Sequence, residues 1–234
     1  MAGRRKKIWI TRAQPAANAT AERVRGMGHD ALVAPLLAVH NLDAAEVDLD
    51  GIAALAFTSA NGVRAFAERS GVRDLKVFAV GAATALAARQ AGFRSVLSTD
   101  GDVAALAEGI AARRGELKGA VLHAGAADLA GDLAGALAAH GVESRRLTLY
   151  ETRPVKLGEA ELKPLLRAEV VLLHSPRAAR ALATIVRAHP APQLRALGLS
   201  QAVLKPLARI KLAAKIAPPY PLEAALLQLI DKEP

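Results

Sequence analysis

A chain of 234 residues, with 52% hydrophobic and 23% charged residues, can bury a large core, so it forms one large domain or two smaller ones. The absence of cysteine excludes disulfides, thiolate nucleophiles, cysteine-bound zinc and iron–sulfur clusters. The net charge of +9 permits a nucleic acid, a phosphorylated ligand or a polycarboxylate as partner, although arginine-rich helix surfaces explain most of this charge.

The beginning of the chain is basic, but the apolar run behind it is only Ile8-Trp9-Ile10. This run is too short for the apolar region of a signal peptide. No stretch approaches the roughly 20 apolar residues that cross a bilayer. We therefore expect a cytoplasmic protein that does not enter a membrane.

The first part of the chain predicts a strand at 8–10, a turn at 11–15 and a helix at 16–27, with Gly28 as the helix C-cap. An extended apolar stretch follows at 31–40. Pro35 interrupts it, and proline cannot donate a hydrogen bond within a central strand. We therefore expect the chain to leave one sheet at Pro35 and enter another part of the structure.

After a polar loop at 41–50, strands and helices alternate regularly. The sequence predicts strands at 52–57, 75–80, 93–97, 120–123, 142–150, 169–174, 194–197 and 211–216. It predicts helices at 61–69, 85–90, 103–112, 128–139, 159–166, 176–188, 201–208 and 222–230, with a tight turn at 81–84. This alternation predicts α/β architecture, with doubly wound parallel sheets and helices on both faces.

An internal repeat indicates that the fold occurs twice. Positions 59 and 175, both serine after an apolar run, are 116 residues apart, and glycines 81 and 198 are 117 apart. Glycines 28 and 141, each at the end of a predicted helix, are 113 apart. The sequence therefore predicts two similar doubly wound, flavodoxin-like domains.

The strand at 8–10 needs neighbouring strands in a sheet. The nearest predicted strands that are not yet assigned to a sheet follow Pro154. We therefore expect a discontinuous domain of residues 1–37 plus 153–234, with a second domain inserted at 40–150. The chain would cross between them near 32–39 and 146–154, which would form a two-stranded hinge. Two domains on such a hinge can grip a ligand between them.

Polar residues follow several predicted strands at the edge where parallel α/β sheets bind ligands. Helix capping explains each of these residues singly, but their occurrence in both repeats favours a surface that binds carboxylates or phosphates. The candidate binding residues are Arg12, Thr58, Ser59, Asn61, Gly81, Thr84, Ser175 and Ser200, with Thr11 beside Arg12.

Tyr150 is the candidate for proton transfer, because it lies where the second crossing returns and its phenol could donate a proton to a leaving hydroxyl. Packing of an amphipathic ring explains the position equally well. The six histidines show no metal-ligand spacing, and His174, which adjoins a serine turn, is expected to be a hydrogen-bonded strand-end residue. The sequence contains no dinucleotide, Walker or nucleophile-elbow motif.

Several short motifs, in this order, resemble the uroporphyrinogen-III synthase family. The chain reads ITR at 10–12, AFTSANGV at 56–63, VGAATA at 80–85, LYET at 149–152 and LHSP at 173–176, and its stretch 28–35 is also similar. Two positions depart from the family pattern. Residues 198–201 read GLSQ where the family often has GPTT, and Ala124-Gly125 replaces an Arg-Gly pair.

The resemblance implies cyclisation of the linear tetrapyrrole hydroxymethylbilane to uroporphyrinogen III, with loss of water and inversion of the last ring, as in haem biosynthesis. It implies a reaction that needs no metal and no organic cofactor. We expect the protein to be a monomer. Tyr150 matches the family's tyrosine and would be the acid. The carboxylates of the substrate would bind to Arg12 and to helix-start amides near Ser59, Thr84, Ser175 and Ser200.

Two other functions remain open. Two α/β lobes on a hinge also describe a non-catalytic protein that binds a small anionic ligand. The positive charge permits nucleic-acid binding, but no basic strand with interleaved aromatic residues supports it.

Overall fold

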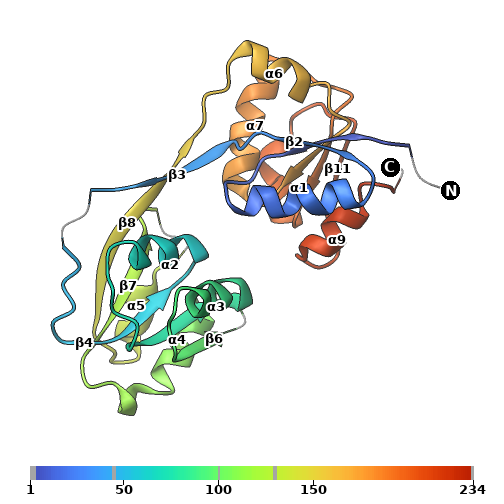
Figure 1. Cartoon of the computed structure of the whole chain (residues 1–234). Helices are drawn as coiled ribbons and strands as arrows, with labels where there is room; N and C mark the ends of the chain where they lie inside the picture. Colours follow the sequence, from blue (N-terminus) through green and yellow to red (C-terminus); the bar gives the residue numbers. More distant parts are fainter. Residues whose placement is uncertain (1–3, 44–45, 100, 129–130, 233–234) are drawn as a thin grey trace. The chain divides into compact units, whose positions relative to one another are not determined.

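The computed structural model describes residues 4–43, 46–99, 101–128 and 131–232, and it divides into two compact units (Figure 1). The terminal unit comprises Met1–Ala38 and Arg153–Pro234. The inserted unit comprises Val39–Thr152. Each unit has its own sheet and its own core.

The sheet of the terminal unit has five strands, and every neighbouring pair is parallel. Its spatial order is β11-β10-β9-β1-β2, which is the 2-1-3-4-5 order of flavodoxin-like folds when the strands are counted along the unit. The strands are β1 (Lys7–Ile10), β2 (Asp30–Val33), β9 (Val170–Leu173), β10 (Arg195–Gly198) and β11 (Ala214–Ile216).

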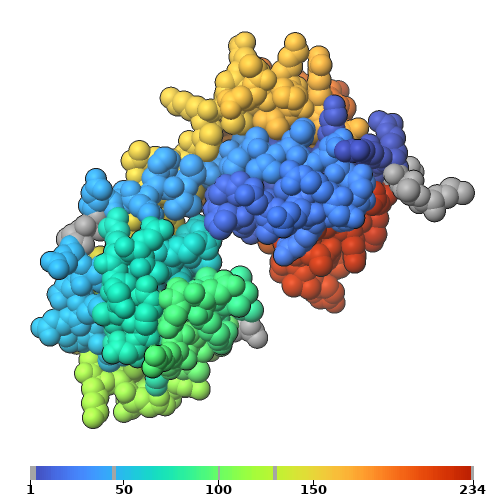
Figure 2. Space-filling view, in the orientation of Figure 1, coloured from blue at the N-terminus to red at the C-terminus, as the bar shows by residue number. Residues whose placement is uncertain are grey.

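Alternating strand residues of the terminal unit divide its core into two layers, as expected for a sheet covered on both faces. Trp9 and Val171 pack with helices α6 (Glu159–Leu165), α7 (Pro176–Ala188) and α8 (Gln201–Leu204). Their neighbours Ile10 and Leu172 pack with α1 (Ala16–Gly26) and α9 (Glu223–Gln228) on the opposite face. In the space-filling view the red C-terminal segment lies against the blue N-terminal segment (Figure 2).

The inserted unit has a sheet in the order β3-β8-β7-β4-β5-β6, and the pairs from β8 to β6 are parallel. Helices α2 and α3 pack on one face of this sheet and α4 and α5 on the other. The strands are β3 (Leu37–Asn41), β4 (Ile52–Phe57), β5 (Lys76–Val80), β6 (Val96–Thr99), β7 (Ala120–Ala126) and β8 (Ser144–Pro154). The helices are α2 (Ala60–Ala67), α3 (Gly81–Gln90), α4 (Val103–Ala111) and α5 (Leu133–Ala139).

Corresponding strands lie in the same spatial order in the two sheets, but they come from different parts of the chain. Without β3, the order β8-β7-β4-β5-β6 matches β2-β1-β9-β10-β11. The chain therefore runs through two consecutive series of five strands, and each unit combines the first two strands of one series with the last three of the other. This arrangement explains why the repeat has a nearly constant offset throughout the sequence.

The predicted fold class is confirmed: both units are doubly wound parallel sheets. The chain leaves the sheet of β2 before Pro35 and enters the sheet of β3 after it. The predicted turn at 81–84 is wrong, because α3 begins at Gly81 itself. Gly81 has a φ of 74°, which lets the backbone turn from strand into helix without a loop.

Smaller differences concern element ends. The predicted helix 201–208 is α8 followed by a 3₁₀ turn at Lys205–Leu207. The predicted helix 128–139 includes positions 129–130, which lie outside the described residues; α5 covers Leu133–Ala139. Within the described part of the chain, no helix is both long enough and apolar enough to cross a membrane.

Candidate functional site

Ser59 is the N-cap of α2, directly beyond the carboxyl end of β4. Its backbone is extended, with φ −157° and ψ 152°, and its Oγ accepts a hydrogen bond from the Gly62 amide at 3.1 Å. Serine favours this position because its side chain satisfies a helix-start amide that has no partner within the helix. The capping explanation from the sequence is therefore correct for Ser59, but it is incomplete.

The hydroxyl of Tyr150 lies 2.7 Å from the Ser59 Oγ. Tyr150 belongs to β8, which pairs with β7, and β7 pairs with β4, so two steps across the sheet join residues 91 positions apart. The tyrosine is only 5% exposed. The structure therefore brings together the candidate acid and one candidate binding residue.

Thr58 points toward a histidine that sequence reasoning missed as a site residue. The Thr58 Oγ1 and the His123 Nε2 are 3.5 Å apart. Burial and the positive charge of Arg146 lower the pKa of His123 to about 4, so its imidazole is neutral near pH 7. The pairing of β7 with β4, which sets Ala56 opposite His123, places this ring, and no local sequence signal reports that register.

The other candidates in the inserted unit lie along α2 and α3. The Asn61 Oδ1 accepts a hydrogen bond from Arg64 at 3.3 Å. Gly81 is the first residue of α3, and Thr84 lies within that helix and is 5% exposed. Because α3 begins four residues earlier than expected, Thr84 lies inside the helix and does not precede it.

In the terminal unit, Ser175 repeats the geometry of Ser59. It caps α7 with φ −150° and ψ 151°, and its Oγ accepts from the Ala178 amide at 3.2 Å. Ser200 precedes α8, a helix of only four residues, and its side chain makes no capping bond. Thr11 is fully buried and donates to the Leu172 carbonyl at 2.6 Å, so its expected place on the ligand surface is wrong.

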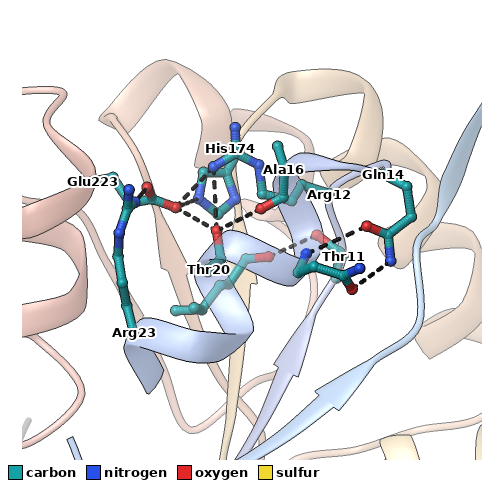
Figure 3. A network of polar contacts seen from close by, with 10 residues as sticks. Thr11, Arg12, Gln14, Ala16, Thr20, Arg23, His174 and Glu223 are labelled. Atoms are coloured by element: carbon teal, nitrogen blue, oxygen red, sulfur yellow. Dashed lines mark hydrogen bonds and ion pairs between the residues drawn. The ribbon is translucent and has the colours of Figure 1, made fainter. Parts of the chain in front are cut away.

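Arg12 belongs to a polar network that joins α1, α9 and the end of β9 (Figure 3). Its Nη1 donates to the Glu223 Oε1 at 2.8 Å and to the Thr20 hydroxyl at 3.3 Å. Glu223 also accepts from Arg23 and from Thr20, and the His174 Nε2 lies 3.3 Å from its Oε1. Arg12 is therefore held in place by the fold.

The Glu223 carboxyl has an unusually low pKa. Burial raises this pKa, but the hydrogen bonds from His174 and Thr20 and the positive charge of Arg12 outweigh burial and lower it to about 2. His174 is hydrogen-bonded through its Nε2 to Glu223, as expected, but its Nδ1 is buried without a partner among the described residues. Sequence reasoning missed Glu223, which meets Arg12 across 211 positions.

Within the described residues, no three histidine, aspartate or glutamate side chains gather into a group that could hold a metal ion. The inserted unit supplies a buried phenol paired with a capping serine. The terminal unit supplies an arginine held by Glu223 and, in a separate contact, a second capping serine. Paired flavodoxin-like units of this kind define a class of two-unit α/β proteins that can bind anions at helix starts and donate a proton.

The family model described as "Uroporphyrinogen-III synthase HemD" matches residues 18–228. The chain belongs to the uroporphyrinogen-III synthase family, the lyases that cyclise hydroxymethylbilane in haem biosynthesis. The resemblance inferred from the short motifs is thereby confirmed. No curated protein matches the chain.

The chain is also similar in fold to solved structures. The crystal structure of uroporphyrinogen-III synthetase from Helicobacter pylori 26695 has a TM-score of 0.70 at 18% identity, covering 97% of this chain and 98% of that chain. A mutant uroporphyrinogen III synthase from the extremely thermophilic bacterium Thermus thermophilus has a TM-score of 0.53 at 17% identity, covering 96% of this chain and 97% of that chain. At these identities the likeness supports the fold.

Proposed function

We propose that Tyr150 is the acid with which this chain cyclises hydroxymethylbilane to uroporphyrinogen III. The observation that carries this proposal is the buried Tyr150 hydroxyl, 2.7 Å from the hydroxyl that caps α2. A phenol held at the carboxyl edge of a parallel sheet lies where such folds bind their ligands. Among the candidate residues of the inserted unit, only Tyr150 is a proton donor of the strength that a departing hydroxide needs.

In the proposed reaction Tyr150 donates one proton and later regains one. Tyr150 donates its proton to the oxygen of the hydroxymethyl group, the C–O bond breaks, and its electron pair leaves with the oxygen as water. The pyrrole nitrogen shares its lone pair with the remaining methylene carbon, which gives an azafulvenium cation. The substituted carbon of the last pyrrole ring attacks this methylene to give a spiro intermediate, and the bond from that carbon to its earlier bridging methylene breaks. The released methylene carbon then bonds to the free carbon of the same ring, which inverts the ring. The proton that this free carbon loses as the ring regains aromaticity restores the phenol.

The carboxylates of the substrate need hydrogen-bond donors. We assign this role to the predicted binding residues other than Tyr150. Arg12 suits this role, because its Nη1 is committed to Glu223 and Thr20 while its Nε and Nη2 have no partner among the described residues. Backbone amides at the starts of α2 and α7 are the second source. The remaining candidates for these contacts are Thr58, Asn61, Gly81, Thr84, Ser175 and Ser200, together with the backbone amides that follow Ser59.

The test supplies purified protein with enzymatically prepared hydroxymethylbilane and separates the porphyrinogen isomers. The type III isomer is expected, whereas the spontaneous reaction gives only type I. Tyr150→Phe should lower the rate by about 100-fold or more, as loss of a general acid does. Its thermal unfolding should stay close to that of the unmodified protein. Only type I product would refute the cyclase function, and an undiminished Tyr150→Phe rate would remove Tyr150 as the acid.

We also propose that the protein works as a cytoplasmic monomer. The absence of cysteine, which fits a reducing compartment, supports the location. Light scattering of the purified chain should give a mass near 24.3 kDa, and a dimer mass would contradict the proposal. Cell fractionation tests the location.

A further inference from the structure

Either hydroxyl of the Ser59–Tyr150 contact can be the donor, and the surrounding hydrogen bonds leave the Ser59 proton available for this contact. The Ser59 Oγ already accepts a hydrogen bond from the Gly62 amide at 3.1 Å. Its own O–H remains to be donated, and the Tyr150 oxygen at 2.7 Å is placed to receive it. When Ser59 donates, the phenol proton is left free to point at another acceptor.

Burial makes this donation important for an acid. Tyr150 is 5% exposed and packs in the core with Phe57 and Leu149, so little water can reach a phenolate there. An anion that loses water needs a hydrogen-bond donor in its place. Ser59 supplies that donor, and α2, whose N-terminal end carries partial positive charge, begins directly after it.

The repeat shows that helix capping does not require the contact. Ser175 has the same extended backbone and makes the same bond to the third following amide, at 3.2 Å. No tyrosine meets Ser175 among the described residues, and Tyr220, the other tyrosine of the chain, is 69% exposed. The phenol partner is specific to Ser59.

We propose that Ser59 is the positioning residue of Tyr150: it donates to the phenol oxygen, turns the phenol proton toward the substrate, and stabilises the phenolate that forms. When the proton moves to the departing oxygen, the O–H electron pair stays on the phenol oxygen, and the Ser59 hydrogen bond shortens onto it. This inference rests on the proposed role of Tyr150.

The hydrogen bond can be tested without substrate. With ¹³C at the Cζ of tyrosine, the chain gives two signals, one each for Tyr150 and Tyr220. Ser59→Ala should shift the Tyr150 signal, Ser59→Thr should restore it by returning a hydroxyl, and Ser175→Ala should leave it unchanged. The Tyr220 signal is the internal reference. An unshifted Tyr150 signal in Ser59→Ala would overturn the hydrogen bond, whatever reaction the protein catalyses.

The positioning role is tested by a double-mutant cycle, in which the rates of the Ser59→Ala, Tyr150→Phe and double variants are compared. Ser59→Ala should lower kcat by about 10- to 100-fold with little change in KM, because one partner of the acid is lost. In the Tyr150→Phe background the same change should cost less than about 3-fold, since no phenol remains to be positioned. Equal losses in both backgrounds would overturn the positioning role. An undiminished Tyr150→Phe rate would instead refute the acid, while the ¹³C result would still stand.

Discussion

At the scale of single residues, two serines in equivalent capping positions differ in what lies beyond the cap. Ser59 and Ser175 share backbone angles and capping bonds, yet only Ser59 meets a phenol among the described residues. Thr58, next to Ser59, lies near a buried neutral histidine. The inserted unit therefore gathers a phenol and a neutral imidazole beside one turn, and the terminal unit holds an arginine at the equivalent edge.

His123 should make stability depend on pH. Its pKa is lowered from 6.5 to about 4 by folding, so between these values the unfolded chain binds the extra proton. Stability should therefore fall as pH drops from 6.5 to 4, by at most ~3 kcal/mol. Urea unfolding of His123→Leu at pH 7 and pH 5 should show a smaller difference than the unmodified protein. His140→Leu, at an exposed position, should keep the full difference in the free energy of unfolding between pH 7 and pH 5. An equal difference in all three proteins would contradict the assignment to His123.

Gly62 allows α2 to approach β7. A Cβ at this position would lie 2.8 Å from the Ala124 carbonyl oxygen. Gly62→Ala should therefore destabilise the protein by roughly 1–3 kcal/mol, as overpacking does. Gly26, the last residue of α1, has no atom within 4 Å of such a Cβ, and Gly26→Ala should be neutral or stabilising. Thermal unfolding measures both, and a neutral Gly62→Ala would show that α2 can move away.

At the scale of secondary-structure elements, α9 is held by packing and by one carboxylate. Leu226, Leu227 and Ile230 bury the apolar face of this C-terminal segment against β1 and α1. Glu223, the first residue of α9, joins that segment to Arg12, Arg23 and His174. The network therefore positions Arg12 and secures the end of the chain together.

Glu223→Gln should weaken this attachment. The carboxyl has a pKa lowered from 4.5 to about 2, so it stabilises the fold above pH 4.5 and loses this effect as pH falls toward 2. The substitution should cost about 2 kcal/mol at neutral pH and flatten acid unfolding in that range. Glu159→Gln, at the first position of α6 and exposed, is the matched control. Identical acid unfolding of Glu223→Gln and the unmodified protein would exclude the network as a source of stability.

At the scale of the whole molecule, the two units have separate cores built from a swapped repeat. The core clusters of the terminal unit and those of the inserted unit share no residue. Each unit nevertheless depends on strands from both series of the repeat. Folding of either unit therefore requires contacts between segments far apart in sequence.

Trp9, the only tryptophan, is fully buried in the terminal unit and reports on that unit alone. Leu173→Ala, in the same core, should move the unfolding transition seen by its fluorescence, since such a truncation costs about 2–5 kcal/mol. Leu55→Ala, in the core of the inserted unit, should move the circular-dichroism transition and leave the Trp9 transition in place. A Trp9 transition that moves equally in both variants would show that the units unfold together.

The fold class and the family could both be predicted from the sequence, whereas the start of α3 could not. Regular alternation of short apolar runs with helical periodicity predicts parallel doubly wound sheets. The predicted turn at 81–84 was wrong because Gly81, with its positive φ, changes the chain direction within one residue. The sequence does not show which φ a glycine adopts. In the site, Ser59 and Ser175 could be recognised as caps, while Thr11 could not be recognised as buried.

The sequence by itself determined the features that depend on neighbouring residues: strand and helix alternation, the caps at Ser59 and Ser175, and the ordered motifs of the family. Only the tertiary structure decided which distant groups meet. Tyr150 reaches Ser59 because β8, β7 and β4 lie side by side, and Arg12 reaches Glu223 because α9 packs against the sheet face that α1 covers. Strand order and helix docking depend on the packing of the whole core, which no local pattern records.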